Sequence, residues 1–246
     1  MAVVIGEAGV APVVLGGASV VVAVPIVAET LEEARDQWEA AAAAGADLVE
    51  WRLDAIEPSQ FDPPRVAQVA EWGRETLKVP VLATIRTQAE GGNYRENNGR
   101  YLALVRQVAS WADGVDVEVN REGAGDLIAS LSPTVSVIAS FHEFSRRPRP
   151  GQIEAILTQM VEGGATVAKV AWMVQDETDL EIVSGAALWA GKNLPVPAVV
   201  IGMGEAGRPT RLGEFARAAA FTFAVASKSS APGQPSVEEV KASLKG

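Results

Sequence analysis

The 246-residue sequence contains no cysteine, which excludes disulfide bonds and every zinc site built on thiolates. It has a single histidine and no calcium-binding loop pattern, so we expect no metal site. Its apolar runs are short and are interrupted by charge, proline or glycine, so none is long enough to cross a bilayer. The protein is therefore expected to have no membrane-spanning part.

Positive charge is scarce as well, because 21 lysines and arginines stand against 31 acidic residues, for a net charge of −10. Nucleic-acid binding requires a basic face, so we expect no nucleic-acid partner. The first residues lack the basic segment and the long apolar segment of a secretory signal, and we expect a cytoplasmic location. Hydrophobic residues make up 48% of the chain, which is enough to build a globular core.

What the sequence does contain is an alternation of apolar, β-branched segments with helical segments, repeating about every 25–30 residues. Eight strands are predicted, at residues 19–26, 47–54, 80–87, 114–120, 134–144, 166–173, 197–203 and 221–226. Eight helices are predicted, at residues 29–44, 63–76, 94–112, 123–130, 152–162, 176–190, 210–217 and 236–244. Strict alternation of this kind is typical of parallel βαβ units.

Eight βα units in this length favour an α/β fold of the (β/α)8 barrel type, or TIM barrel, over an open doubly wound sheet. No GxGxxG pattern follows the first strand, which weakens a dinucleotide-binding interpretation. Within residues 1–18, residues 2–5 and 13–15 flank a glycine-containing turn and are predicted to form a short β-hairpin that closes the barrel floor. No low-complexity linker divides the chain, so we expect one domain over residues 1–246.

Charged and polar residues recur at alternate positions of five predicted strands, where a barrel interior normally holds Val, Ile, Leu or Ala. They are Glu50, Arg52 and Asp54; Thr84 and Arg86; Asp116, Glu118 and Asn120; Ser140 and His142; and Lys169. Side chains two apart share a face, and several of these lie in the C-terminal halves of their strands. We therefore expect them to converge on the barrel mouth, where barrel active sites lie. The alternative is that individual members point outward as structural ion pairs under the helices.

Two of these residues have the chemistry of a nucleophile and its proton shuttle. Lys169 interrupts an apolar strand, where an ammonium is costly unless it is paired or neutral, and a neutral amine attacks carbonyl carbon. His142 is the only histidine, and its reference pKa of about 6.5 suits proton transfer in both directions. A lone histidine is more often structural than catalytic. However, consecutive strands lie about 4.8 Å apart, so both side chains can reach one substrate.

Six segments in order carry a family resemblance: EWRLD (50–54), TIRTQAEGG (84–92), SFHEF (140–144), AKVAWM (168–173), GMGEAGRPTR (202–211) and SKSSAPGQ (227–234). Together they resemble the type I 3-dehydroquinate dehydratases of the shikimate pathway, from about Ser19 to the C-terminus. The resemblance implies a lyase of aromatic amino acid biosynthesis that converts 3-dehydroquinate to 3-dehydroshikimate. It also implies that no cofactor is needed and that the protein is a homodimer.

The resemblance further implies a mechanism. Lys169 would form a Schiff base with the C3 ketone of the substrate, and His142 would remove a C2 proton and protonate the departing C1 hydroxyl, a syn elimination. The same histidine would assist carbinolamine formation and imine hydrolysis. Glu90, in the Gly-rich loop after the third strand, would orient His142. Glu118 and Asp116 would support the polar floor of the site.

The same carry-over identifies substrate-binding residues. Arg211 would pair with the substrate carboxylate, for which a guanidinium fork is suited. Ser230 and Gln234 would add hydrogen bonds from the loop after the last strand, which could act as a lid. Three further residues would hold the ring hydroxyls: Glu50, Arg52 and Arg86.

Three positions depart from the family pattern. Pro25 stands where some relatives have a hydroxyl residue, Glu205 where a lysine is frequent, and Glu143 where aspartate is usual. None of them alters the lysine–histidine pair, so they bear on affinity more than on reaction type.

Two alternative functions are open on the sequence alone. A class I aldolase also uses a Schiff-base lysine on a barrel strand, but one with phosphorylated substrates would want a Gly-rich phosphate cradle after strands seven and eight. A barrel without activity could serve as a scaffold, but it would have no use for a buried lysine, histidine and arginine that are costly to retain.

Overall fold

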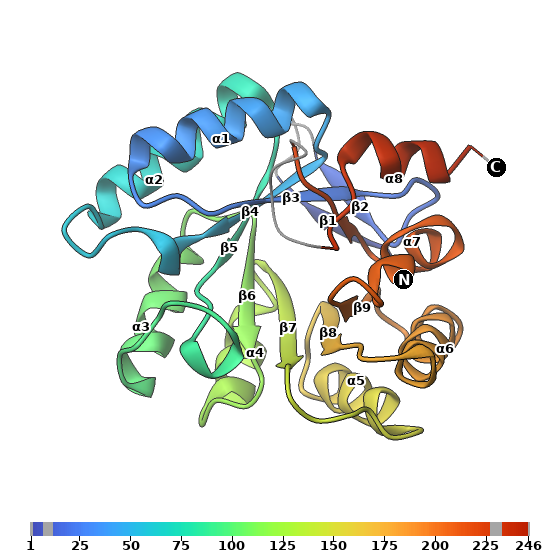
Figure 1. Ribbon diagram of the computed structural model, residues 1–246. Coiled ribbons are helices and arrows are strands. Elements are labelled where there is room, and N and C mark those ends of the chain that lie inside the picture. Colours follow the sequence, from blue (N-terminus) through green and yellow to red (C-terminus); the bar gives the residue numbers. More distant parts are fainter. Residues whose placement is uncertain (1, 7–11, 227–232, 246) are drawn as a thin grey trace.

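The computed structural model describes residues 2–6, 12–226 and 233–245, and its centre is a ring of eight parallel strands surrounded by helices (Figure 1). The strands are β3 (Val22–Ile26), β4 (Leu48–Arg52), β5 (Val81–Thr84), β6 (Gly114–Glu118), β7 (Ser136–Glu143), β8 (Val167–Met173), β9 (Ala198–Met203) and β10 (Thr222–Phe223). They pair in the order β10-β3-β4-β5-β6-β7-β8-β9. Ala220 N donates to Ala198 O at the seam between β9 and β10. The predicted (β/α)8 barrel is confirmed.

The helices alternate with these strands, and several begin at the polar residues that favour helix starts. They are α1 (Leu31–Ala44), α2 (Pro63–Trp72), α3 (Asn98–Val108), α4 (Ala124–Leu131), α5 (Gln152–Glu162), α6 (Glu177–Asn193), α7 (Gly213–Ala218) and α8 (Val237–Ser243). The side chains of Thr30, Asn97, Asp176 and Ser236 accept hydrogen bonds from the first turns of their helices. In the described residues, no helix is long and apolar enough to span a bilayer.

Three predicted elements are shorter or divided. The helix expected from residue 94 begins only at Asn98, because Tyr94 N donates to Arg86 O and its segment bridges back to Thr87. The helix expected over 210–217 is split into a 3-10 turn (Arg208–Arg211) and α7. The strand expected over 221–226 is reduced to β10, followed by a single bridge from Val225.

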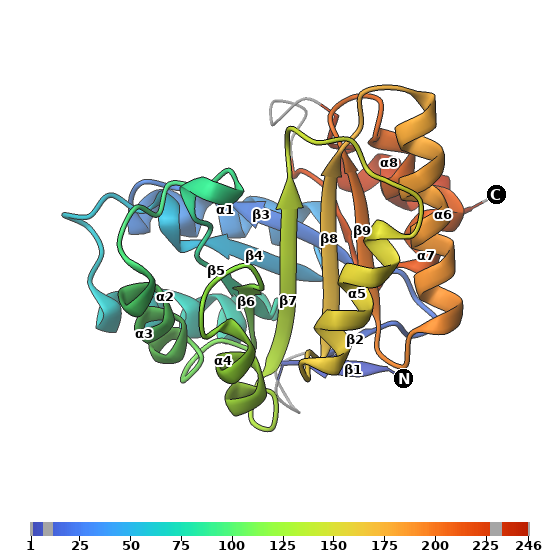
Figure 2. The ribbon, with the colours of Figure 1, turned by 90° about the horizontal axis from the view of Figure 1, so that it is seen from below.

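The predicted hairpin is present, with β1 (Val3–Ile5) antiparallel to β2 (Val13–Leu15). It lies at the end where β7 and β8 begin, opposite their arrowheads (Figure 2). Ile5 and Leu15 are fully buried among barrel-floor residues. A Cβ on Gly114 would lie 2.8 Å from Ile5 Cδ1, so the glycine leaves the space that this side chain fills. The hairpin therefore covers the barrel floor.

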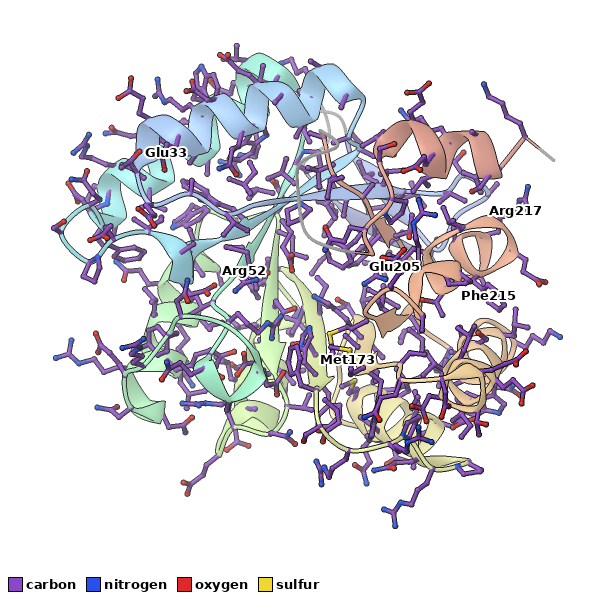
Figure 3. The ribbon with its side chains drawn as sticks, viewed as in Figure 1. Glu33, Arg52, Met173, Glu205, Phe215 and Arg217 are labelled. Carbon is purple, nitrogen blue, oxygen red and sulfur yellow. The ribbon has the colours of Figure 1, made fainter. Side chains whose placement is uncertain are left out.

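Alternate residues of the strands face opposite ways, as the sequence predicts. On β8, Val167 and Ala171 belong to the apolar cluster inside the barrel, whereas Val170 and Trp172 belong to the larger cluster with the helices. Side chains fill the barrel interior and the space between the strands and the helices. Arg52 and Met173 lie toward the middle of the ring (Figure 3). Lys169, between Val167 and Ala171 on the same face, therefore points into the barrel.

Candidate active site

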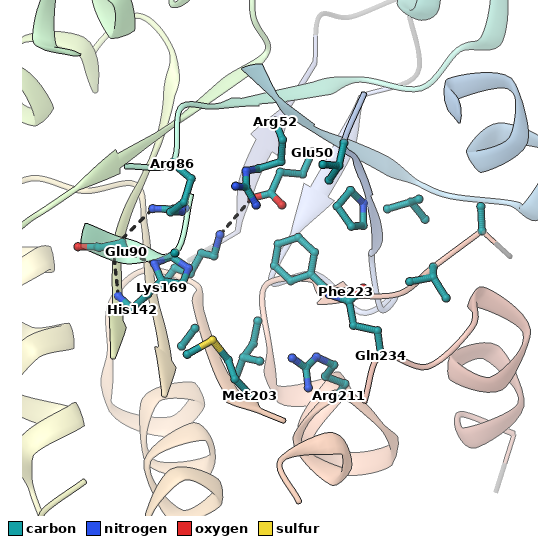
Figure 4. Close-up of a pocket in the computed structure, with 18 of the residues that line it drawn as sticks. Glu50, Arg52, Arg86, Glu90, His142, Lys169, Met203, Arg211, Phe223 and Gln234 are labelled. Atoms are coloured by element: carbon teal, nitrogen blue, oxygen red, sulfur yellow. Dashed lines mark hydrogen bonds and ion pairs between the residues drawn. The ribbon is translucent and has the colours of Figure 1, made fainter. Parts of the chain in front are cut away.

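A cavity of about 690 Å³ opens at the C-terminal ends of the strands (Figure 4). Its lining includes eight of the nine site residues predicted from the sequence: Glu50, Arg52, Arg86, Glu90, His142, Lys169, Arg211 and Gln234. The ninth, Ser230, lies outside the described residues. The barrel thus brings these eight side chains together from segments that are far apart in the sequence.

The amine of Lys169 is buried and paired. Its Nζ lies 3.2 Å from Glu50 Oε1 and 3.1 Å from Asp116 Oδ2, and 4.9 Å from the centroid of the Phe223 ring. A buried lysine can be accommodated as a neutral amine or as an ammonium paired with carboxylates, and here it is paired. Phe223 adds a cation–π contact on the cavity side.

Arg86 is the hub of the acidic residues around this lysine. Its Nη2 lies 2.9 Å from Asp116 Oδ2, and its Nη1 donates to Glu118 Oε1 and Ser140 Oγ, both at 3.0 Å. Burial alone would lower the pKa of Arg86, but the carboxylates of Asp116 and Glu118 raise it above its usual value. Arg86 was expected to hold ring hydroxyls. Arg86 lines the cavity, so that role stays a prediction, while its Nη1 and Nη2 contacts hold the acidic residues in place.

His142 is oriented by Glu90. The His142 backbone N donates to Glu90 Oε2 at 3.1 Å, and ring Nδ1 lies 2.8 Å from the same oxygen. Because Glu90 Oε2 already accepts from the His142 backbone, we assign it as the acceptor for Nδ1–H as well, which leaves Nε2 as the free base. Burial, reinforced by Arg86 and Lys169, lowers the pKa of His142 well below 6.5. Burial and the nearby Glu118 raise the pKa of Glu90 to about 8, so both partners are driven toward their neutral forms.

Glu90 reaches His142 because the loop after β5 folds tightly back on itself. Gly92 N donates to Thr87 O, and a Cβ on Gly92 would lie only 2.0 Å from Arg86 O. Gly91 has φ +82° and carries the ring of Phe144 against it. Only glycine fits these two positions, which explains the EGG sequence locally.

Arg211 stands on the other side of the cavity, in the 3-10 turn after β9 (Figure 4). Its Nη1 donates to Gly202 O at 2.7 Å, whereas its buried Nε has no hydrogen-bond partner in the described chain. Burial lowers the pKa of Arg211 to about 10, and none of the ion pairs among the described residues includes it. A buried guanidinium with an open donor is suited to an anionic ligand.

Two residues expected at the mouth lie elsewhere. Strand β4 ends at Arg52, and Asp54 follows in a 3-10 turn where it pairs with Arg52 at 2.9 and 2.8 Å and accepts from Arg86 N. Asn120 is exposed beyond the end of β6. Because the strands stop earlier than predicted, neither residue is among the described ones that line the cavity.

The apolar wall of the cavity was not predicted. It includes Phe223, Met203, Ile201, Ala171 and Phe144. Part of this wall could have been predicted from the sequence. Alternate residues of 199–203 and 221–225 are apolar, and alternate residues of a strand share one face, here the inner one.

The three departures from the family pattern occupy different places. Pro25 lines the cavity, whereas Glu205 is exposed and lies outside its lining. The Glu143 carboxylate accepts from the backbone N of Ser145 and of Arg146. These bonds overcome the effect of burial and lower the pKa of Glu143 to about 2, so the longer side chain holds the turn after β7. In the described part of the chain, no group of three His, Asp or Glu side chains is arranged to hold a metal ion.

Comparison with known proteins places the chain among close relatives. A family profile described as Type I 3-dehydroquinase matches residues 22–245. The 3-dehydroquinate dehydratase of Geobacillus thermodenitrificans is 32% identical over 247 residues, covering 98% of this chain and 96% of the relative. That of Enterococcus faecalis is 34% identical over 231 residues, covering 91% of each. The solved type I enzyme from Clostridium difficile, carrying covalently modified comenic acid, aligns with a TM-score of 0.87 at 28% identity, covering 95% of this chain and 94% of that one.

Proposed function

The chain belongs to the type I 3-dehydroquinase family, and we propose that it dehydrates 3-dehydroquinate to 3-dehydroshikimate through a Schiff base on Lys169. The observation that carries this proposal is the placement of a buried amine, a neutral imidazole and an open guanidinium around one cavity. An amine that attacks a ketone, a base for the adjacent proton and a partner for the carboxylate are what this reaction needs.

Binding would begin with the substrate carboxylate on Arg211 and the ketone against Lys169. Arg52 and Glu50 line the side of the cavity away from Arg211 and would hold ring hydroxyls, with Gln234 near Arg211 (Figure 4). The iminium formed at C3 withdraws electrons and acidifies the C2 protons. Lys169 therefore supplies the electron sink for the elimination.

His142 would then carry the proton. Its Nε2, free because Nδ1–H is held by Glu90, removes a C2 proton and returns it to the C1 hydroxyl, which leaves as water. One base on one face of the ring gives a syn elimination. Hydrolysis of the product imine restores the lysine.

Borohydride trapping tests the Schiff base. Reduction in the presence of 3-dehydroquinate should add the substrate mass to the peptide that contains Lys169. The same label is expected in a Lys192→Met control, because Lys192 is exposed and lies outside the cavity lining. His142→Ala should still form adduct, while turnover falls by about 10²–10⁴-fold, the scale of general acid–base catalysis. Label at another lysine, or near-normal turnover of His142→Ala, would contradict these roles.

Other properties are proposed on the family resemblance and the sequence: a homodimer, a cytoplasmic location, one domain over residues 1–246, and activity without a metal or organic cofactor. Sedimentation equilibrium would test the homodimer, and a single calorimetric unfolding transition would test the single domain. Full activity after prolonged dialysis against a chelator would test the activity without a metal or organic cofactor.

A further inference from the structure

The two carboxylates on the Lys169 amine are not equivalent. Asp116 is 1% exposed and also binds Arg86 Nη2 at 2.9 Å and Ser140 Oγ at 2.5 Å. Burial would raise the pKa of Asp116, but Arg86 and Lys169 hold it well below its usual range. Asp116 is therefore a fixed negative charge that cannot readily accept a proton from its neighbour.

Glu50 makes fewer contacts with the protein than Asp116 does, and it is more accessible from the cavity. Its Oε1 accepts from Thr84 Oγ1 at 3.1 Å and from Lys169 Nζ at 3.2 Å. Its ion pair with Lys169 involves no second cation within 4.0 Å in the described residues. Glu50 lines the cavity (Figure 4), whereas Asp116 is not among the described residues that line it. Of the two acceptors on the amine, Glu50 is the one that also lines the cavity proposed to hold the substrate.

We propose that Glu50 is a second acid–base residue of imine formation beside His142: it takes a proton from the Lys169 ammonium and returns it to the oxygen that leaves as water. This inference rests on the proposed Schiff-base function. It adds a chemical role to the hydroxyl contact that the family resemblance implies for Glu50.

The protons balance over the sequence. The ammonium gives one proton to the Glu50 carboxylate, and the nitrogen lone pair attacks the ketone carbon as the C=O π electrons move to oxygen. That oxygen then takes one proton from the attacking nitrogen and one from Glu50. Water leaves as the nitrogen lone pair forms the C=N bond, so the iminium keeps one proton and Glu50 is again a carboxylate.

His142 is placed to reach the ring proton as well. In the β7–β8 register it is Ser140 that faces Lys169, while His142 faces Ala171, two residues nearer the mouth. Its Nδ1 is held by Glu90, which leaves only Nε2 for the substrate. The site thus provides one base beside the amine and a second base farther along the barrel axis, where the ring proton is removed.

The test is the rate of imine formation at saturating 3-dehydroquinate, measured by rapid mixing followed by borohydride quench between pH 6 and 9. Glu50→Gln keeps the size of the side chain and an acceptor for Thr84 but removes the base. Glu181→Gln is the matched control, because it makes the same change at an exposed carboxylate of α6 that lies outside the cavity lining. Glu50→Asp retains the carboxylate but draws it back from Nζ.

We expect Glu50→Gln to slow imine formation by about 10²-fold, with part of the rate recovered as pH rises and hydroxide replaces the base. Glu181→Gln should leave both KM and the saturated rate unchanged. A Glu50→Gln rate equal to or above wild type, with only KM raised, would overturn the proposal, because a merely pairing carboxylate stabilises the unreactive ammonium.

Folding of each variant is checked by circular dichroism. Should Glu50→Gln not fold, Glu50→Asp decides: slower trapping supports the role, and trapping at the wild-type rate refutes it. The absence of any adduct in the wild-type protein would instead overturn the Schiff-base function itself, which is a separate outcome.

Discussion

The inner faces of five neighbouring strands change character over two residues. Toward the floor they carry Leu48, Leu82, Gly114, Ile138 and Val167, and two residues later the same faces carry Glu50, Thr84, Asp116, Ser140 and Lys169. The floor is apolar and is sealed by Ile5 and Leu15 of the hairpin, while the mouth is a network of buried charges. Apolar burial stabilises the fold, whereas buried ion pairs contribute little net stability. The barrel therefore separates stability and chemistry along its axis.

The largest effect is expected from removing the amine at the mouth. Lys169→Met should reduce turnover by about 10⁶-fold, the scale for loss of a covalent nucleophile, with the fold retained because Asp116 keeps Arg86 as its partner. Formation of the conjugated enone product is followed by absorbance, with Lys192→Met as the control. Turnover within tenfold of wild type would show that the mouth does not act through this lysine.

A substitution at the barrel floor should lower the unfolding free energy and leave turnover nearly unchanged. Leu48 is fully buried two residues below Glu50 on the same face, and Leu48→Ala should cost about 2–5 kcal/mol of unfolding free energy. Because Leu48 does not line the cavity, kcat should change only a few-fold. Urea unfolding and steady-state kinetics on one preparation measure both quantities. A large loss of kcat without a loss of stability would break the separation between floor and mouth.

Arg211→Ala should mainly raise KM, by about 10–100-fold, since a hydrogen bond to a charged group contributes about 1.5–3 kcal/mol. The unfolding free energy should fall only slightly, because the guanidinium gives one hydrogen bond to Gly202 O and leaves its buried Nε unpartnered. Arg211→Lys should recover part of the affinity as a point charge without the fork. An effect confined to kcat would argue against carboxylate binding at this position.

The smallest effect is a pH dependence of stability from Glu90. Its pKa is about 8 in the native state against an ordinary 4.5, so the native protein retains a proton that the unfolded chain releases between these values. This contribution to stability is full below about pH 4.5 and is lost as pH rises through about 8. Wild type should therefore lose on the order of 1–2 kcal/mol relative to Glu90→Gln between pH 6 and 9. Urea unfolding at both values measures it, and a constant difference would contradict the raised pKa.

Much of the fold was predictable because its signals are local. Alternation of apolar and polar residues shows which face of β8 is inner, and the Ser236 and Glu239 pair that starts α8 forms the expected capping box. The errors arose where distant contacts decide. Tyr94 is not part of α3, because its backbone N donates to Arg86 O. Asp54 is not part of β4, because its carboxylate accepts from the backbone N of Arg86 and of Asn93.

The candidate site divides in the same way. The sequence by itself determined that a lysine interrupts an apolar inner face and that a histidine stands on the preceding strand, because both facts follow from spacing along the chain. It could not determine what surrounds the amine, since Glu50 and Asp116 lie 119 and 53 residues away. Among the described strands, β8 pairs with β7 and β9, so β4 and β6 contact it across the interior of the barrel. Only closure of the barrel, whose width is set by strand number and tilt, brings those carboxylates within hydrogen-bond distance of Lys169.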